Sequence, residues 1–179
     1  MEELENWNKI KNGNYRSFEK VFKAYYNDLY SYGMKLSGDS ALTKDIIEEM
    51  FTYICANRQN INEVFSLKAY LLKCFRNRFL KALPKQNKLA GENHIEVDFD
   101  CSCEEFIIQN ETNKSKAKKL KNALQNLSER QKEVIFLKYY IGLNYTEIEK
   151  HMGIRYQSIR NTVHQAISKL RETVVVENS

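Results

Sequence analysis

Residues 127–171 read LSERQKEVIFLKYYIGLNYTEIEKHMGIRYQSIRNTVHQAISKLR. Ser128 and Gln131 have the spacing of a capping box, in which two side chains bond reciprocally to the backbone at the start of a helix. Asn144 and Glu147 repeat that spacing further along the stretch. The stretch therefore predicts two capped helices in succession, separated by a break.

The second capped helix leads into a helix-turn-helix. We expect this helix over 145–152, because Gly153 suits the left-handed residue that ends a helix. A longer helix follows over 155–170, and two helices joined by a glycine-containing turn form this motif. Two residues depart from the usual pattern: Arg155 is a poor N-cap, and Glu149 is a charge where such turns usually hold a small residue. The two helices would pack through Ile148, Met152, Ile154, Ile159 and Val163.

The outer face of the last helix is polar and carries the residue types that read DNA. In the major groove an arginine can hydrogen bond to guanine, and an asparagine or glutamine to adenine. A plain pair of helices with a solvated face is the alternative that the pattern leaves open. The polar residues of this face are Arg155, Tyr156, Gln157, Ser158, Arg160, Asn161, His164 and Gln165.

Charge is distributed unevenly along the 179 residues, whose formal net charge is +5. Residues 66–88 hold seven lysines and arginines and no acid, and residues 114–172 hold thirteen against five acids. Between them, 89–113 holds seven acids. Two basic blocks that flank an acidic connector suggest a polyanion contacted at two places.

Apolar residues that recur every three or four positions predict four further helices. These helices cover 15–36, 41–57, 67–83 and 114–126. By contrast, 58–65 is loop-like, and 87–102 lacks periodicity and is expected to be flexible. The sequence therefore predicts an all-α fold. Two small helical domains, over 1–84 and 114–179, would be joined by an acidic linker over 85–113.

Two of these helices have surfaces that suit partners. Helix 41–57 has more apolar residues than one stripe needs, beside several acids, so it is a candidate protein-docking face. A core helix with a solvated acidic side fits the pattern equally well. Helix 67–83 combines basic side chains with Tyr70 and Phe75, as single-stranded nucleic acid requires, since cations meet phosphates and rings stack on bases. A solvated basic face is the alternative there.

Composition and spacing argue against membrane and metal proteins. No apolar run approaches the roughly 20 residues of a membrane span. Residues 1–14 are polar and lack a signal-peptide core, so we expect a cytoplasmic protein without membrane insertion. Cys101 and Cys103 do not have a usual zinc spacing, and Cys55 and Cys74 fall in helical patterns as buried thiols. We therefore expect no metal and no cofactor.

The residue patterns do not favour an enzyme. The sequence lacks a glycine-rich phosphate loop and a metal-ligand set. None of His94, His151 and His164 has an evident nucleophilic partner, and His151 is expected at the surface. We therefore expect a binding protein without catalytic residues.

Three stretches in the right order resemble the extracytoplasmic-function (ECF) sigma factors of bacterial RNA polymerase. The C-terminal stretch quoted above is similar to their region 4. Residues 45–51, DIIEEMF, are similar to the run D-x-x-Q-E-x-F of region 2, with Glu48 in place of Gln. Residues 66–78, SLKAYLLKCFRNR, are close to F-x-x-W-L-x-x-I-A-R-N. Arg155 and Tyr156 open the recognition helix in place of a Ser-Val pair.

The resemblance implies a sigma factor that binds core RNA polymerase and directs promoter recognition and melting. Core polymerase would be contacted by Asp45, Ile47, Glu48, Glu49 and Phe51. A base flipped from the minus-10 element would be held by Asn57, Asn60 and Asn62. The backbone of that element would be held by Lys68, Lys73, Arg76, Asn77 and Arg78.

The recognition helix would lie in the major groove of the minus-35 element. Its base edges would be read by Arg160, Asn161, His164 and Gln165, and its phosphates contacted by Arg155, Tyr156 and Ser158. Family members are usually held inactive by an anti-sigma factor, which is a further candidate partner. The linker over 85–113 would pass through the polymerase interior.

A stand-alone helix-turn-helix regulator, acting without core polymerase, is the alternative function. It explains the C-terminal half equally well. It does not explain the acid-free block over 66–88 or the run over 45–51. The two functions differ in whether specific promoter binding requires core polymerase.

Overall fold

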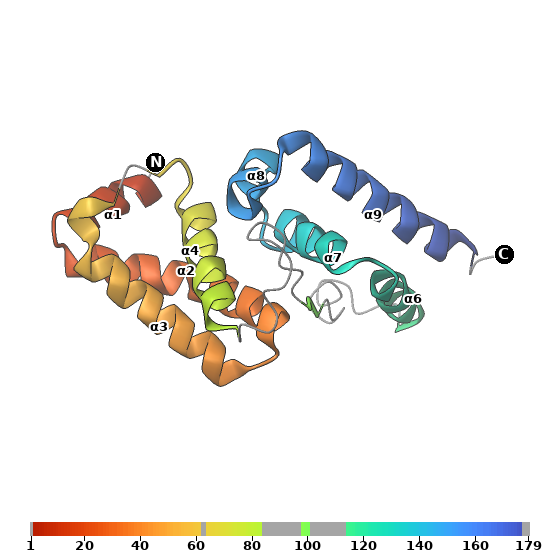
Figure 1. Cartoon of the computed structure of the whole chain (residues 1–179), viewed down its shortest axis with the longest axis horizontal. Helices are drawn as coiled ribbons and strands as arrows, with labels where there is room; N and C mark the ends of the chain where they lie inside the picture. Colours follow the sequence, from red (N-terminus) through yellow and green to blue (C-terminus); the bar gives the residue numbers. More distant parts are fainter. Residues whose placement is uncertain (1, 62–63, 84–97, 101–113, 177–179) are drawn as a thin grey trace. The chain divides into compact units, whose positions relative to one another are not determined.

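The structure of the chain is a computed structural model, and it describes residues 2–61, 64–83, 98–100 and 114–176 (Figure 1). In these ranges every regular element is a helix, which confirms the predicted all-α class. Over the same ranges, no helix combines the length and apolar character that crossing a lipid bilayer requires. The chain divides into two compact units, Met1–Ile95 and Glu96–Ser179, and each is described by itself.

The N-terminal unit is a bundle of helices. It contains α1 (Glu2–Lys11), α2 (Tyr15–Ser37), α3 (Ser40–Ala56), the short 3₁₀ turn η1 (Arg58–Asn60) and α4 (Leu67–Ala82). The helices predicted over 15–36, 41–57 and 67–83 are confirmed to within one residue at each end. Helix α1 was not predicted, because the stretch that forms it is mostly polar.

Three helices of this unit begin at a side chain that caps them. The Asn14 side chain accepts a hydrogen bond from the third backbone N–H that follows it, at the start of α2. Asp39 caps α3 and Ser66 caps α4 in the same manner. A cap of this kind stabilises a helix by about 1 kcal/mol, because it satisfies a backbone N–H that has no partner within the helix.

The core of the N-terminal unit lies where α2, α3 and α4 meet. Gly33, in the middle of α2, lets the other two helices approach closely. A Cβ atom at this position would lie 2.4 Å from Thr43 Cγ2 on α3 and 2.7 Å from Phe75 Cζ on α4. Helix α1 covers the bundle with Trp7, whose ring meets the Tyr70 ring edge-on at 5.6 Å between centroids.

The C-terminal unit places a long helix against three shorter ones. It contains α6 (Lys114–Gln125), α7 (Glu129–Ile135), the π-helical turn η3 (Phe136–Tyr140), α8 (Tyr145–Met152) and α9 (Tyr156–Val176). Helix α9 packs on α6, α7 and α8. The predictions of α6 and α8 are confirmed. Helix α9 begins one residue later than predicted and extends six residues further.

The π-helical turn η3 interrupts the helix that the sequence predicts after Ser128. Here the Ile141 N–H bonds to the Phe136 carbonyl at 3.0 Å, five residues back instead of four. Gly142 then ends the helix with φ +84°, a left-handed conformation that suits glycine. The capping boxes at the starts of α7 and α8 are both formed, which confirms the two capped helices.

Part of the acidic linker belongs to the C-terminal unit. The Phe99 side chain is 1% exposed, and its ring packs edge-on against Phe136 at 5.5 Å between centroids. Its N–H donates to Glu129 Oε2 at 2.6 Å. The expectation of flexibility over 87–102 is therefore wrong at Phe99, because an aromatic ring among acids can be buried when a partner ring is available. Its neighbours Asp98 and Asp100 are exposed, and residues 87–97 and 101–102 of that stretch lie outside the described residues.

Candidate nucleic-acid interface

The turn between α8 and α9 has the geometry of a helix-turn-helix. Gly153 ends α8 in the left-handed conformation, with φ +69°, and its N–H bonds to the Glu149 carbonyl at 2.8 Å. Ile148 and Ile159 are fully buried where the two helices meet, and Met152 and Ile154 are half-buried beside them. The packing predicted from the sequence thus fixes how α9 lies on α8.

Burial on one side of α9 leaves its polar side exposed. Ile159, Val163 and Ala166 are buried, so the positions between them point outward. The exposed predicted residues of this face are Arg155, Tyr156, Gln157, Arg160, Asn161, His164 and Gln165. Ser158 is half-buried, and its carbonyl accepts from the Thr162 hydroxyl at 2.8 Å. We refer to the outward positions from 155 to 165 as the recognition face.

Some side chains of the recognition face are already held in place. Gln157 Nε2 donates to Asn161 Oδ1 at 3.1 Å, one helical turn along. The Tyr156 ring meets the Tyr145 ring of α8 at 5.9 Å between centroids, and Lys138 Nζ lies 4.8 Å from the centre of the Tyr145 ring. These contacts restrict the side chains before binding, so less conformational entropy is lost when the recognition face binds a partner.

The first backbone N–H of α9 has an acceptor from the neighbouring helix. The Tyr156 N–H donates to Glu149 Oε1 at 2.8 Å. The two departures noted in the sequence, a charged residue at 149 and a poor N-cap at 155, are thereby connected in the structure. No local pattern predicts this bond, since its two residues lie on different helices.

A second basic face lies along α4 in the N-terminal unit. Lys73 and Asn77 are exposed, and Arg76 and Arg78 are half-buried. Lys68 Nζ forms an ion pair with Asp28 Oδ2 at 2.8 Å, so its charge is partly neutralised before any phosphate arrives.

Two exposed aromatic residues next to this basic face were missed by the sequence reasoning. The Tyr53 side chain on α3 is 53% exposed, and the Arg78 guanidinium lies 4.6 Å from the centre of its ring. Phe65, just before α4, is 72% exposed. Tyr53 could have been found, because it falls outside the apolar stripe of α3 and therefore has to point away from the core.

The asparagines predicted to hold a flipped base have different surroundings. The Asn57 side-chain nitrogen donates to the Tyr53 carbonyl at 2.9 Å, at the end of α3. Asn60 is exposed in η1. Asn62 lies outside the described residues. Asn57 is thus already bonded to the end of a helix, which the sequence did not indicate.

The predicted polymerase-docking residues divide into two groups. Asp45, Glu48 and Glu49 are exposed on α3. The Ile47 and Phe51 side chains are 0% and 3% exposed, so their prediction as contact residues is wrong. They are buried because α2 and α4 both pack on α3 and together cover its apolar residues. Phe51 meets the rings of Phe18 and Phe22 edge-on, at 5.7 and 4.9 Å between centroids.

The cysteines and histidines that the structure describes show no arrangement typical of catalysis. Cys55 and Cys74 are half-buried, and burial raises the pKa of the Cys74 thiol and of its neighbour Tyr70. The prediction of a surface position for His151 is wrong: its side chain is buried, on the same side of α8 as Ile148. Cys101, Cys103 and His94 lie outside the described residues. Within the described ranges, no three potential metal ligands come together.

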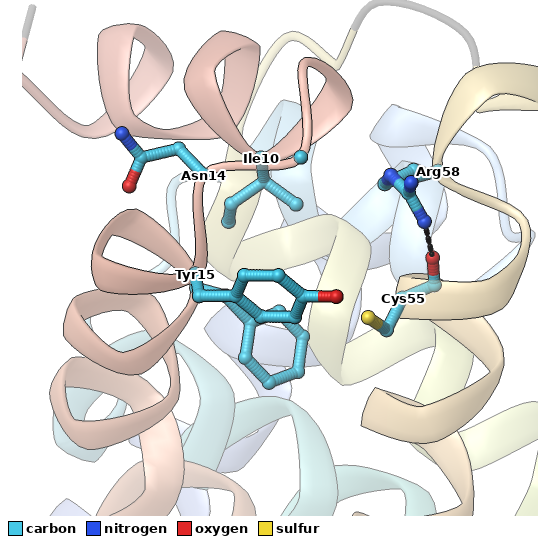
Figure 2. A pocket seen from close by; sticks show the side chains of 7 residues that line it. Ile10, Asn14, Tyr15, Cys55 and Arg58 are labelled. Atoms are coloured by element: carbon cyan, nitrogen blue, oxygen red, sulfur yellow. Dashed lines mark hydrogen bonds between the residues drawn. The ribbon is translucent and has the colours of Figure 1, made fainter.

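A small hollow in the N-terminal unit is shown in Figure 2. It lies between the start of α2 and the end of α3 and is lined by Ile10, Gly13, Asn14, Tyr15, Phe18, Cys55 and Arg58. Arg58 Nη1 donates to the Cys55 carbonyl at 3.0 Å beside it. Its volume of about 10 Å³ suits one water molecule and no metabolite.

The exposed recognition face on α9 and the basic face on α4 are features typical of a DNA-binding protein. Comparisons with known proteins identify it further. The family model for Sigma-70 region 2 matches residues 21–89, and the model for Sigma-70 region 4 matches residues 117–170. The chain is 24% identical over 158 residues to the ECF RNA polymerase sigma factor SigM of Bacillus subtilis, covering 87% of this chain and 93% of SigM.

Two solved structures have the same fold. CnrH, in complex with the cytosolic domain of CnrY, matches with a TM-score of 0.65 and 13% identity, over 97% of both chains. The sigma factor RpoE of Bartonella quintana, in complex with the anti-sigma factor NepR, matches with a TM-score of 0.61 and 20% identity, over 90% of this chain and 98% of RpoE.

The chain belongs to the sigma-70 family, and within it to the ECF sigma factors. It therefore binds core RNA polymerase and directs transcription initiation at promoters. The alternative of a stand-alone regulator is not favoured, because the N-terminal half matches region 2 and the C-terminal half matches region 4.

Proposed function

We propose that the two units divide the promoter between them, with α9 reading the minus-35 element and α4 holding the minus-10 element as it melts. The observation that carries this proposal is the recognition face of α9. It is exposed, polar and fixed from behind by buried Ile159 and Val163. A helix held in this way can enter a major groove without rearranging its own unit.

On α9, we assign base reading to Arg160, Asn161, His164 and Gln165. All four side chains are exposed, and they occupy two successive turns of one side of the helix. We assign phosphate contacts to Arg155, Tyr156 and Ser158, which lie at the end of the helix where a groove-bound helix passes the DNA backbone.

On α4, we assign backbone contacts to Lys68, Lys73, Arg76, Asn77 and Arg78. The exposed rings of Tyr53 and Phe65 add surfaces on which unpaired bases can stack. The Arg78 guanidinium lies over the Tyr53 ring, so this pair presents a cation and an aromatic ring together. Asn60 remains our candidate for contact with a flipped base, with Asn57 engaged at the end of α3.

For core polymerase, we assign docking to the exposed acids of α3, Asp45, Glu48 and Glu49. They form one side of a helix whose apolar residues are used inside the unit. Exposed acids at an interface steer a basic partner and fix its register. Ile47 and Phe51 would contribute to polymerase binding only indirectly, because as buried residues they hold α3 in place within the unit.

We also propose domain boundaries, location and a regulator. The N-terminal domain would span 1–84, and the C-terminal one would span 114–179 together with the segment around Phe99, which docks on α7 and η3. RpoE is bound to the anti-sigma factor NepR in its structure, and CnrH is bound to the cytosolic domain of CnrY, which supports an anti-sigma factor as a partner of this chain. The protein would act in the cytoplasm and would not itself be an enzyme.

Run-off transcription with purified core polymerase on a library of genomic fragments tests the proposal. Adding the protein should produce transcripts from a small set of fragments that share two sequence elements. Nuclease footprinting should then show protection of the upstream element only when the C-terminal unit is present. Transcription that is identical with and without the protein, or fragments that share no upstream element, would refute the division of the promoter.

A further inference from the structure

The recognition helix lacks a cap from its own first residues. The first backbone N–H groups of a helix have no partner within it. At the position before α9 stands Arg155, whose side chain can only donate hydrogen bonds and so cannot accept one from those groups. The N–H of Tyr156 is instead satisfied by Glu149 Oε1 at 2.8 Å, from the last turn of α8.

Glu149 holds both sides of the turn. Its backbone carbonyl accepts the Gly153 N–H at 2.8 Å, which closes the end of α8. Its side chain accepts the Tyr156 N–H, which opens α9. A few ångströms away, the Tyr145 and Tyr156 rings meet across the same junction. One residue therefore ties the end of one helix to the start of the next.

We propose that Glu149 is a positioning residue for promoter recognition, acting as the N-cap that the sequence of α9 lacks. This inference rests on the proposed role of α9 at the minus-35 element. By bonding to the first N–H of α9, Glu149 sets the angle and register at which the recognition face enters the groove. It touches no base itself.

The charge of Glu149 has a second consequence. A helix N-terminus carries partial positive charge and attracts DNA phosphates. Because the Glu149 carboxylate accepts the Tyr156 N–H, a phosphate at this end of α9 would be contacted by the side chains of Arg155, Tyr156 and Ser158 and not by that backbone group. Loss of the whole side chain should therefore weaken discrimination between sequences more than it weakens total DNA binding, because the freed N–H offers a non-specific phosphate contact as the positioning is lost. Loss of the charge alone should strengthen binding to all sequences alike and leave discrimination largely unchanged.

Four variants separate positioning from charge. Glu149→Ala removes the acceptor, and Glu149→Gln keeps an acceptor oxygen of the same reach without the charge. Arg155→Ser, alone and combined with Glu149→Ala, supplies a conventional cap at the start of α9. Glu172→Ala is the matched control, because it removes an exposed acid of α9 far from the turn.

The measurement is transcription by holoenzyme, assembled from purified core polymerase, on promoters with a randomised minus-35 element. Selectivity is the ratio of transcripts from preferred to scrambled elements. Glu149→Ala should lower this ratio about fivefold, the effect of losing an ordinary N-cap. Glu149→Gln and Glu172→Ala should leave it within about twofold by the same scale. The double variant Glu149→Ala/Arg155→Ser should have a higher selectivity ratio than Glu149→Ala. Its ratio should approach that of Arg155→Ser alone, which is the reference for the double variant.

Unchanged selectivity in Glu149→Ala, or an equal loss in Glu149→Gln, would overturn the positioning role. If Glu149→Ala does not fold, as judged by circular dichroism, the double variant decides. Recovery of folding and selectivity supports the cap, and absence of recovery overturns it. If the wild-type holoenzyme shows no preference for any minus-35 sequence, the proposed role of α9 is refuted. If the wild type is selective and Glu149→Ala is equally selective, only the role of Glu149 is refuted.

Discussion

Replacing Phe51 with alanine separates a docking residue from a core residue on α3. The stretch DIIEEMF that contains Phe51 is the part of the sequence that most suggests contact with polymerase. The Phe51 side chain, however, is 3% exposed and packs between Phe18 and Phe22. We therefore expect Phe51→Ala to lower the stability of the N-terminal unit and to affect polymerase binding only through folding.

The expected magnitude follows from the burial. Truncating a buried phenylalanine to alanine costs about 3–5 kcal/mol, and the loss of two ring contacts places Phe51 in the upper half of that range, about 4 kcal/mol. With a urea dependence of about 2 kcal/mol per molar, the unfolding midpoint should fall by about 2 M. Because small domains are stable by about 5–15 kcal/mol, most molecules of the variant should remain folded without urea.

The assay uses a natural probe. Trp7 is the single tryptophan of the sequence, and its side chain is buried in the N-terminal unit, so its fluorescence reports the unfolding of that unit. Polymerase association is measured in parallel by titrating labelled protein with core enzyme. The matched variant carries Asp45→Asn, Glu48→Gln and Glu49→Gln. It should bind polymerase more weakly at unchanged stability, because exposed substitutions usually stay within about 0.5 kcal/mol.

The opposite pattern would refute the reasoning. If Phe51→Ala kept its unfolding midpoint and lost polymerase affinity, Phe51 would contact the partner directly and the N-terminal unit would have to open on binding. If the triple variant bound polymerase as tightly as the wild type, the acidic side of α3 would not be the docking surface.

Four further perturbations test the other assignments. Arg160→Ala should cost about 1–3 kcal/mol at one base position of the minus-35 element, and equal weakening on all sequences would show a phosphate contact instead. Gly33→Ala should destabilise the N-terminal unit by more than about 1 kcal/mol in urea titrations followed by Trp7 fluorescence, because the new methyl group would lie 2.4 Å from Thr43 Cγ2. Phe99→Ala should cost about 3 kcal/mol and speed amide hydrogen exchange in α7, whereas unchanged exchange would mean that the linker contact is not maintained. Raising salt from 50 to 200 mM should weaken holoenzyme binding to promoter fragments in filter assays by at least tenfold if phosphate contacts dominate, and a flat dependence would contradict the basic face.

Local signals in the sequence predicted most helices but not every burial. The two capping boxes are formed as predicted, because their bonds depend on residues three positions apart. Helix α1 depends on contacts that no local pattern shows, since Trp7 packs on Tyr70 of α4. His151 could have been predicted to be buried, because it follows Ile148 by three positions and so shares its side of α8.

The candidate site was predictable where a single helix defines it. Every third or fourth residue of α9 is apolar, so the recognition face could be inferred from spacing alone. On α3 the same reasoning failed at Ile47 and Phe51, because two helices pack on α3 and periodicity does not reveal how many neighbours a helix has. Tyr53 was missed because its exposure follows only after the apolar residues of α3 are assigned to the core.

On the basic face of α4, Lys68 can form an ion pair within the protein and still bind a DNA phosphate. The ion pair between Lys68 and Asp28 has side chains that are about one third exposed, 32% and 30%. Such a pair contributes at most about 1 kcal/mol, so a DNA phosphate can compete for Lys68 at little cost. Until then the pair holds the Lys68 ammonium beside Asp28, as the Tyr53 ring holds the Arg78 guanidinium. Positioning a side chain before binding reduces the entropy lost on contact. Removal of Asp28 should therefore raise the overall attraction for DNA while leaving the melted strand less firmly positioned.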